Sequence, residues 1–112
     1  QKDEIINSVN FVADIVEVSN ADALKKLCFD LKHHLRDHVA VLCVNLGGKP
    51  FVAVGIDEKT VAAKNLDAGK IIKEIVAPII KGGGGGQKTL ATAGGQDASN
   101  LQKVIDAVKG LI

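Results

Sequence analysis

Tryptophan, tyrosine and methionine are absent from this 112-residue chain, and phenylalanine occurs only three times. A protein that holds single-stranded bases on a broad stacking surface needs several aromatic rings on one face. So few rings exclude such a platform. They leave recognition of phosphates, 2′-hydroxyls and overall shape as the way in which this chain could bind a nucleic acid.

Long apolar runs are missing as well. No run approaches the roughly 18 residues of a membrane span, and the chain does not open with the pattern of a signal peptide. The chain begins at Gln1 and contains no methionine. We therefore expect a piece cut from a longer protein, with no membrane partner.

Cysteine is scarce, and both cysteines, Cys28 and Cys43, lie within apolar patterns. Free cysteine behaves as a small hydrophobe and is commonly buried. Thiols on core faces of a chain without a signal peptide are typical of reduced, cytosolic proteins. We predict two buried thiols and a cytoplasmic location, although the sequence alone leaves a disulfide open.

No arrangement of catalytic residues can be identified. The sequence has no Ser–His–Asp or Cys–His pattern and no carboxylate pair suited to general acid–base catalysis. His34 and His38 have the spacing of a metal-binding pair, with Asp37 beside them, but a zinc site requires three or four converging ligands. A solvated helix end explains these residues. We predict no metal, no cofactor and no catalysis in the isolated chain.

The pattern of apolar residues predicts one domain of the α/β class. The hydrophobic share of 46% and charged share of 24% suit a single core. We predict a small mixed β-sheet (β-α-β-β-α-loop-α) with helices packed on it, a parallel first pair and an antiparallel hairpin at Gly47-Gly48. The expected strands are 9–18, 39–44 and 51–56, with a further edge strand over 89–93. The run 39–44 is apolar throughout, which predicts a strand covered on both faces.

Local signals define three helices. Ser19 with Asp22 forms a capping box for the first, Asp67 caps the second, and Asp97 or Ser99 caps the third. Pro78 is expected to end or bend the second helix. The apolar stripes comprise Leu24, Leu27, Cys28, Leu31 and Leu35, then Ala68, Ile71, Ile72, Ile75, Val76 and Ile79, and finally Leu101, Val104, Ile105 and Val108.

Glycine is concentrated in one stretch, with five in a row from Gly82 to Gly86 and a pair at Gly94 and Gly95. Each costs about 0.5–1 kcal/mol relative to alanine in a folded element. Three features can explain glycine in spite of this cost: a positive φ angle, close approach of another backbone, or backbone amides left exposed to bind an anion. We interpret the stretch as an amide-lined loop that binds an anion, next to the start of the last helix. A flexible linker is the alternative, although such linkers usually contain serine.

The nearest enzymatic motif is the phosphate-binding P-loop. Lys88 and Thr89 lie at the required distance from Gly82, but Gln87 replaces the glycine that should precede the lysine. A P-loop also follows a strand and opens a helix, whereas here a helix is expected before the glycines. These differences argue against nucleotide binding.

Charge is distributed unevenly along the chain. Residues 1–58 carry six Lys/Arg and nine Asp/Glu, a net charge of −3, whereas residues 59–112 carry eight Lys and four acids, a net charge of +4. The basic half contains the glycines, bracketed by Lys81 and Lys88. This distribution favours an anionic partner near the glycines.

These residues resemble the DHH-associated domain, in particular the version that closes alanyl-tRNA synthetases. The resemblance is carried by Gly82 to Gly86, by Ala91-Thr92-Ala93-Gly94-Gly95 and by a terminal helix, and it covers nearly the whole chain. Related phosphoesterases typically place a histidine straight after the glycines, where this chain has Gln87. We assign 9–112 to this domain and 1–8 to the end of a preceding linker or helix.

The resemblance implies a non-catalytic tRNA-binding domain of an enzyme, an alanine–tRNA ligase. Its partners would be alanine-specific tRNA, contacted at the outer corner, and the other synthetase domains. Such a tether helps the aminoacylation and editing domains act on one tRNA by raising effective concentration. A weak homodimer is a further expectation. Two alternatives stay open: the substrate-binding domain of a DHH-type phosphoesterase, and a homodimerisation module.

The residues expected to contact the nucleic acid are amides and side chains of the glycine stretch. They are Lys81, Gly83, Gly84, Gly85, Gly86, Gln87, Lys88, Gly94 and Gly95.

Overall fold

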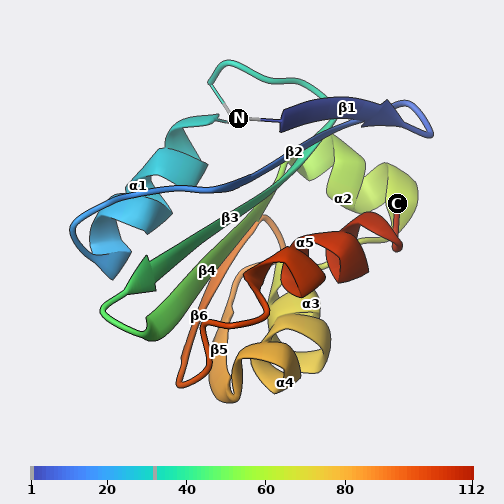
Figure 1. The fold of residues 1–112 in the computed structure, drawn as a ribbon. Coiled ribbons are helices and arrows are strands. Elements are labelled where there is room, and N and C mark those ends of the chain that lie inside the picture. The colour runs from blue at the N-terminus through green and yellow to red at the C-terminus, as the bar shows by residue number, and fades with distance from the viewer. Residues whose placement is uncertain (1, 32) are drawn as a thin grey trace.

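Six strands form one mixed sheet with helices on both faces in the computed structural model, which describes residues 2–31 and 33–112 (Figure 1). The strand order is β1-β2-β3-β4-β6-β5, with β2 and β3 parallel and the other neighbouring pairs antiparallel. The predicted α/β class and mixed sheet are confirmed. The strands are β1 (Lys2–Ile6), β2 (Val9–Ile15), β3 (His38–Leu46), β4 (Lys49–Ile56), β5 (Gly82–Gly86) and β6 (Leu90–Gly95). The helices are α1 (Ala21–Leu31), α2 (Glu58–Lys64), α3 (Ala68–Ile71), the π-helical turn η1 (Ile72–Val76), α4 (Ala77–Ile80) and α5 (Leu101–Lys109).

Strand β3 is buried on both faces, as its unbroken apolar run predicts. Alternate side chains of a strand point to opposite faces, so the strand contributes to two separate hydrophobic clusters. Val39, Val41 and Cys43 belong to one cluster, and Ala40, Leu42 and Val44 belong to the other.

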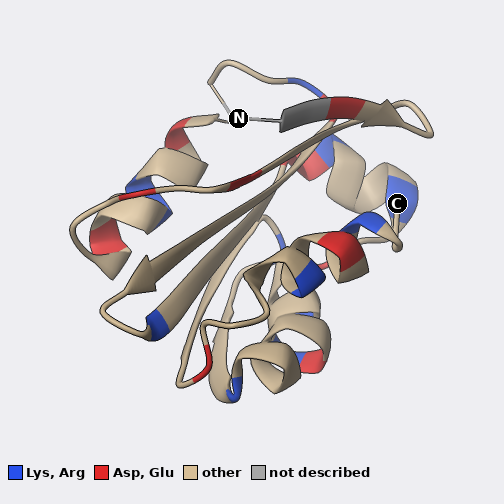
Figure 2. Cartoon of the chain, viewed as in Figure 1, with Lys and Arg blue, Asp and Glu red and all other residues tan. Residues whose placement is uncertain are grey.

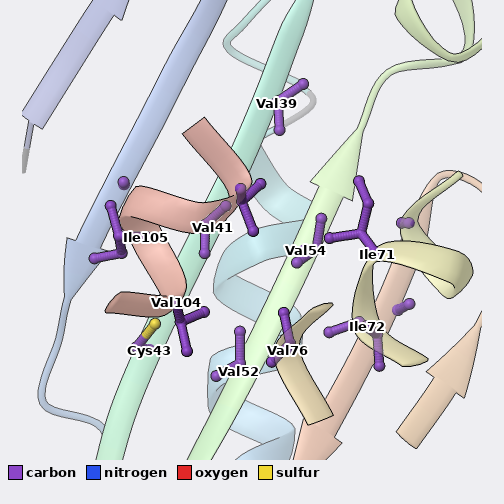
Figure 3. Packing of buried hydrophobic residues seen from close by; sticks show 14 of the residues in the cluster. Val39, Val41, Cys43, Val52, Val54, Ile71, Ile72, Val76, Val104 and Ile105 are labelled. Atoms are coloured by element: carbon purple, nitrogen blue, oxygen red, sulfur yellow. The ribbon is translucent and has the colours of Figure 1, made fainter. Parts of the chain in front are cut away.

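Each face of the sheet has its own cover (Figure 1). Helices α3 to α5 pack on the face that carries the larger cluster, where Ile72, Val76 and Val104 meet the valines of β3 and β4 (Figure 3). Helix α1 covers the other face, over β3 and β4. None of the helices in the described part of the chain has the length and apolar character needed to cross a membrane.

The two cysteines are free and buried, as predicted. Cys28 belongs to the cluster under α1 and Cys43 to the cluster on the opposite face of the sheet. This separation closes the question of a disulfide that the sequence left open. Burial raises the pKa of each thiol to about 12, so both stay protonated and unreactive at neutral pH.

Residues 68–80 form one helical segment, so of the two expectations for Pro78, that it ends the helix or bends it, the first is wrong. Proline lacks an N–H group and crowds the carbonyl four residues earlier. The segment widens into the π-helical turn η1 just before Pro78, which then lies in the first turn of α4. The wider turn makes room for the proline ring, and the helix continues to Ile80.

Helix starts differ from prediction at two of three places. Asp67 caps α3, where its Oδ1 accepts a hydrogen bond from the Lys70 N–H at 3.2 Å. For α1 the cap is Asn20, one residue after the predicted Ser19, and its Oδ1 accepts from the Ala23 N–H at 2.8 Å. Helix α5 follows Asn100, while Asp97 and Ser99 form a local turn in which the Ser99 N–H donates to the Asp97 carboxylate.

The predicted apolar stripes of the second and third helices are buried or packed against the core, apart from half-buried Ile75. The prediction for the first helix is partly wrong. Leu24 and Cys28 are buried, but Leu27 is 40% exposed. Leu35 packs on the core from beyond the end of α1. Residues Glu58–Lys64 form α2, a helix that is not among the three predicted.

Residues 2–6 form strand β1, where the sequence suggested a linker or helix. The strand pairs with β2 through a tight turn at Asn7 and Ser8, which both adopt positive φ angles of 51° and 69°. Because neither residue is glycine, the turn carries no strong hairpin signal. The hairpin predicted at Gly47 and Gly48 is present, with φ angles of 62° and 94°.

The glycine run is an edge strand, so the predicted loop is wrong. Gly82 to Gly86 pair with β6 as β5, the outermost strand of the sheet. Strand β6, expected at the edge over 89–93, lies between β4 and β5. Glycine disfavours strands on average, so propensity alone could not have predicted β5.

Close approach of the β6 backbone explains why every second position of β5 is glycine. A Cβ atom on Gly82, Gly84 or Gly86 would lie 2.0, 2.1 or 2.6 Å from the carbonyl oxygen of Gly94, Thr92 or Leu90. No such contact exists at Gly83, where a Cβ would meet nothing within 4 Å. The glycine at 83 therefore has no steric cause within the described chain.

This alternation predicts opposite effects of two neighbouring substitutions. Gly84→Ala forces a methyl group into the β6 backbone and should lower the free energy of unfolding by about 2 kcal/mol or more. Gly83→Ala meets no steric obstacle and should leave it unchanged or raise it by about 0.4–1 kcal/mol. Urea unfolding followed by circular dichroism measures both. Equal destabilisation by the two variants would contradict the steric account.

Candidate functional site

Strand β5 presents a bare edge. Four of its five glycines are exposed and Gly85 is half-buried. An edge strand has one side paired and one side of unpaired N–H and C=O groups, and without side chains nothing of the strand's own covers them. A partner can therefore approach this main chain without meeting side chains of β5, although Gly69 of α3 packs near the Gly86 end, where a Cβ on Gly69 would lie 3.1 Å from the Gly86 carbonyl oxygen.

The pairing with β6 decides which amides point outward. The Gln87 N–H donates to the Leu90 carbonyl at 2.8 Å, and in an antiparallel ladder this arrangement repeats every second residue. Gly83 and Gly85 therefore pair with β6, while Gly82, Gly84 and Gly86 turn their N–H groups to the outer side. Only every second amide of β5 is therefore available to a ligand, whereas the predicted loop could have exposed all of them.

Three lysines surround this edge. Lys81 precedes β5 as the cap of α4, with a left-handed φ of 55°, and Lys88 lies in the turn after β5. The third is Lys73, on η1, which no pattern in the sequence connects with the glycines. A Cβ on Gly85 would lie 3.1 Å from the Lys73 Cε atom, which places the end of this side chain against Gly85.

One of these lysines is partly neutralised. The Lys81 Nζ lies 4.0 Å from an Asp97 carboxylate oxygen. Hydrogen bonds from Ser99 lower the pKa of Asp97 below its ordinary value, and the Lys81 charge lowers it further, so Asp97 stays ionised. Lys81 and Lys88 lie at opposite ends of β5, too far apart to hold one phosphate together.

A pocket of about 310 Å³, which we call the glycine-floored pocket, opens between β5, β6 and the first turn of α1. Its lining includes four of the predicted site residues, Gly83, Gly84, Gly85 and Gly94. Gly95 lies elsewhere, because a Cβ there would come within 2.2 Å of the Ile80 carbonyl oxygen. Gly86 and Gln87 belong to the hairpin end of the strand.

The electrostatics of this region are mixed. Lys25 and Asp22 from α1 both line the glycine-floored pocket, so their charges oppose one another. Basic and acidic residues alternate over the helices and turns, while the strands carry few charges (Figure 2). The cations suited to an anionic backbone are therefore those along the β5 edge, and the pocket itself is close to neutral.

His38, expected at a solvated helix end, is the first residue of β3 and is 1% exposed. Helix α1 has ended at Leu31. Within residues 2–31 and 33–112, no group of three or more His, Cys, Asp or Glu side chains is arranged to hold a metal ion. Burial lowers the pKa of His38, and the nearby Asp57 charge opposes this only in part, so the ring is neutral at pH 7.

Asp57 fixes the chain around His38. Its carboxylate accepts hydrogen bonds from the Asp37 and His38 N–H groups at 3.0 and 3.1 Å. Burial on its own would raise the pKa of Asp57, but these bonds and one from Thr60 outweigh it, and the pKa lies below its ordinary value. Asp57 therefore remains an acceptor at neutral pH.

The neutral, buried His38 predicts a pH dependence of stability. Its pKa in the folded state lies below the unfolded value of about 6.5, so the unfolded chain takes up a proton that the folded chain does not. The free energy of unfolding should be constant above about pH 7. It should fall below pH 6.5 by up to about 1.4 kcal/mol per pH unit.

Urea unfolding between pH 8 and 5 measures this slope, with His38→Phe as the control. The Phe variant lacks the titrating ring, so its stability should change less over the same range, whatever its absolute stability. An identical slope in the two proteins would show that His38 does not cause the dependence.

Comparison with known proteins shows the family to which this chain is related. A model of the DHHA1 domain matches residues 8–112. The alanine–tRNA ligase of Cytophaga hutchinsonii is 39% identical over 109 residues, which cover 97% of this chain and 12% of that protein. The alanine–tRNA ligase of Pediococcus pentosaceus is 36% identical over 104 residues, 93% of this chain and 12% of that protein.

A solved structure has the same fold. The crystal structure of the C-Ala domain from Aquifex aeolicus alanyl-tRNA synthetase superposes with a TM-score of 0.88 at 23% sequence identity. The match covers 99% of this chain and 97% of that one. The chain thus corresponds to about an eighth of the length of its curated relatives and to nearly all of the solved domain.

Proposed function

This chain belongs to the DHHA1 domain family, and from that premise we propose that it is the non-catalytic, tRNA-binding C-terminal domain of an alanine–tRNA ligase. The relatives that carry that name favour this over the phosphoesterase alternative. So does Gln87, which stands where phosphoesterases of this kind place a histidine. Catalysis by the parent enzyme would reside in other domains.

The observation that carries the proposal is the bare glycine edge with its three lysines. A ribose–phosphate backbone running along β5 would meet the outward amides of Gly82, Gly84 and Gly86, and Lys73, Lys81 and Lys88 would supply positive charge beside it. Backbone N–H groups and lysines bind phosphate oxygens without reading sequence. Such a surface recognises the shape of a folded RNA, in keeping with the shortage of aromatic residues.

We place the contact at the outer corner of the tRNA. Anchored there, the domain would hold one tRNA near both the aminoacylation and editing domains and would act by effective concentration. Specificity for alanine tRNA would then come mainly from the rest of the enzyme. A weak homodimer and a cytoplasmic location stay predictions.

Phosphate binding predicts a steep salt dependence. The logarithm of the tRNA association constant should fall linearly with the logarithm of salt concentration, with a slope of about −0.7 to −0.9 for each phosphate contacted. Replacing Lys73, Lys81 and Lys88 together by alanine should weaken binding at low salt. It should also reduce the magnitude of the slope by about 1 for each phosphate-binding lysine removed.

The matched control is Lys103→Ala, an exposed lysine on α5, a helix that packs mainly on β2, β3, α4 and η1. This variant should retain the slope and nearly all of the affinity, which fluorescence anisotropy with end-labelled tRNA measures. If the triple variant and the control gave the same slope as the unaltered chain, the β5 edge would not be the phosphate-binding surface.

A further inference from the structure

A second pocket, of about 380 Å³, lies at the last turn of α1, and we call it the His38 pocket. Its floor comes from the end of β4 and the start of β6, and α1 and the start of α2 form its walls. The volume is within the range of small-molecule sites. None of the residues predicted from the glycine stretch lines it.

The His38 ring supplies unused hydrogen-bonding capacity in this pocket. The side chain is almost completely buried, and neither ring nitrogen has a hydrogen-bond partner within the described residues. A neutral imidazole offers one N–H donor and one acceptor on the same ring. Buried polar groups are nearly always paired, so an unpaired ring at a pocket wall indicates that a ligand completes it.

The remaining wall is apolar and includes an aromatic ring. Phe29 lines the pocket with 43% of its surface exposed, and it meets the His33 ring edge to face at 5.8 Å between centroids. Ile56 and Leu90 also line the pocket. Gly55 keeps the floor low, because a Cβ there would come within 2.9 Å of the Cys28 sulfur atom.

Charge at the rim selects against an anion. Asp57 and Glu58 both line the pocket, with Lys59 the cation beside them. The Lys59 Nζ lies 3.6 Å from an Asp37 carboxylate oxygen, so its charge is partly balanced. A phosphate would be repelled here, whereas a neutral planar group with polar edges would not.

We propose that the His38 pocket binds one unpaired nucleobase, which lies against Phe29 and exchanges hydrogen bonds with the His38 ring. A base combines the required properties: a flat apolar face, donors and acceptors on its edge, and no charge. One ring suffices for one base, so the shortage of aromatic residues is no obstacle. The site rests on the proposed function, because the base would belong to the bound tRNA.

The position of the pocket supports the same ligand. The glycine-floored pocket lies at the first turn of α1 and the His38 pocket at its last, and both share β4 and β6 as floor. Eight residues of helix separate Ala21 from Phe29, a rise of about 12 Å. An RNA strand could therefore follow one side of α1 from the phosphate-binding edge to the base pocket.

Free nucleosides test the pocket without any contribution from phosphate. Adenosine, guanosine, cytidine and uridine are titrated separately into the isotope-labelled chain, and the His38 ring nitrogen signals are followed by NMR, with ribose as the control ligand. At least one nucleoside should shift the His38 signals saturably, and ribose should not. Phe29→Ala should weaken that binding about tenfold or more, while Leu27→Ala, an equally exposed residue of α1 outside this pocket, should not.

The outcomes separate this inference from the proposed function. If no nucleoside moves the His38 signals, or if Phe29→Ala binds as tightly as Leu27→Ala, the base pocket is wrong even where tRNA binding and its salt dependence persist. Nucleoside binding that survives in the Lys73, Lys81 and Lys88 triple variant supports the pocket independently of the phosphate surface. The proposed function fails alone if the unaltered chain binds a nucleoside in this pocket but does not bind tRNA.

Discussion

The close contact between β5 and β6 is the constraint on which the site depends. Carbonyl oxygens of β6 occupy the space where side chains of Gly82, Gly84 and Gly86 would begin, so only glycine permits these two strands to pair as they do. The pairing places β5 at the edge of the sheet and fixes which amides face outward. The contact that adds β5 to the sheet thus also leaves a stretch of main chain that a ligand can reach.

The remaining glycines of the strand have a different cause. Gly83 has open space where its side chain would be, and Gly85 meets only the end of the flexible Lys73 side chain. Folding does not require glycine at these two positions, and both line the glycine-floored pocket. In the proposed function these two glycines would form a smooth floor for a partner, since the core does not require them.

The sequence predicts the parts of this fold that depend on local pattern. Local signals were sufficient for the continuous apolar run of β3, the Gly47-Gly48 turn, the Asp67 cap and the apolar stripe of α5. The errors have two causes. Strand β5 and the β1 turn at Asn7 and Ser8 belong to hairpins with adjacent segments, but their residues carry no strong strand or turn signal. The burial of His38 and the contact of Lys73 with Gly85 depend on packing between separate elements, which no local pattern along the chain indicates. Of the predicted site, Gly83, Gly84, Gly85 and Gly94 come together, whereas Lys81 and Lys88 lie at opposite ends.

The most direct test of the account is to observe the β5 amides while tRNA binds. In NMR spectra of the ¹⁵N-labelled chain, the outward amides of Gly82, Gly84 and Gly86 should shift or broaden as tRNA is added. The amides of β1, at the opposite edge of the sheet, should stay unchanged. If tRNA binds and the β5 amides remain where they were, the glycine edge is not the contact surface and the account is wrong.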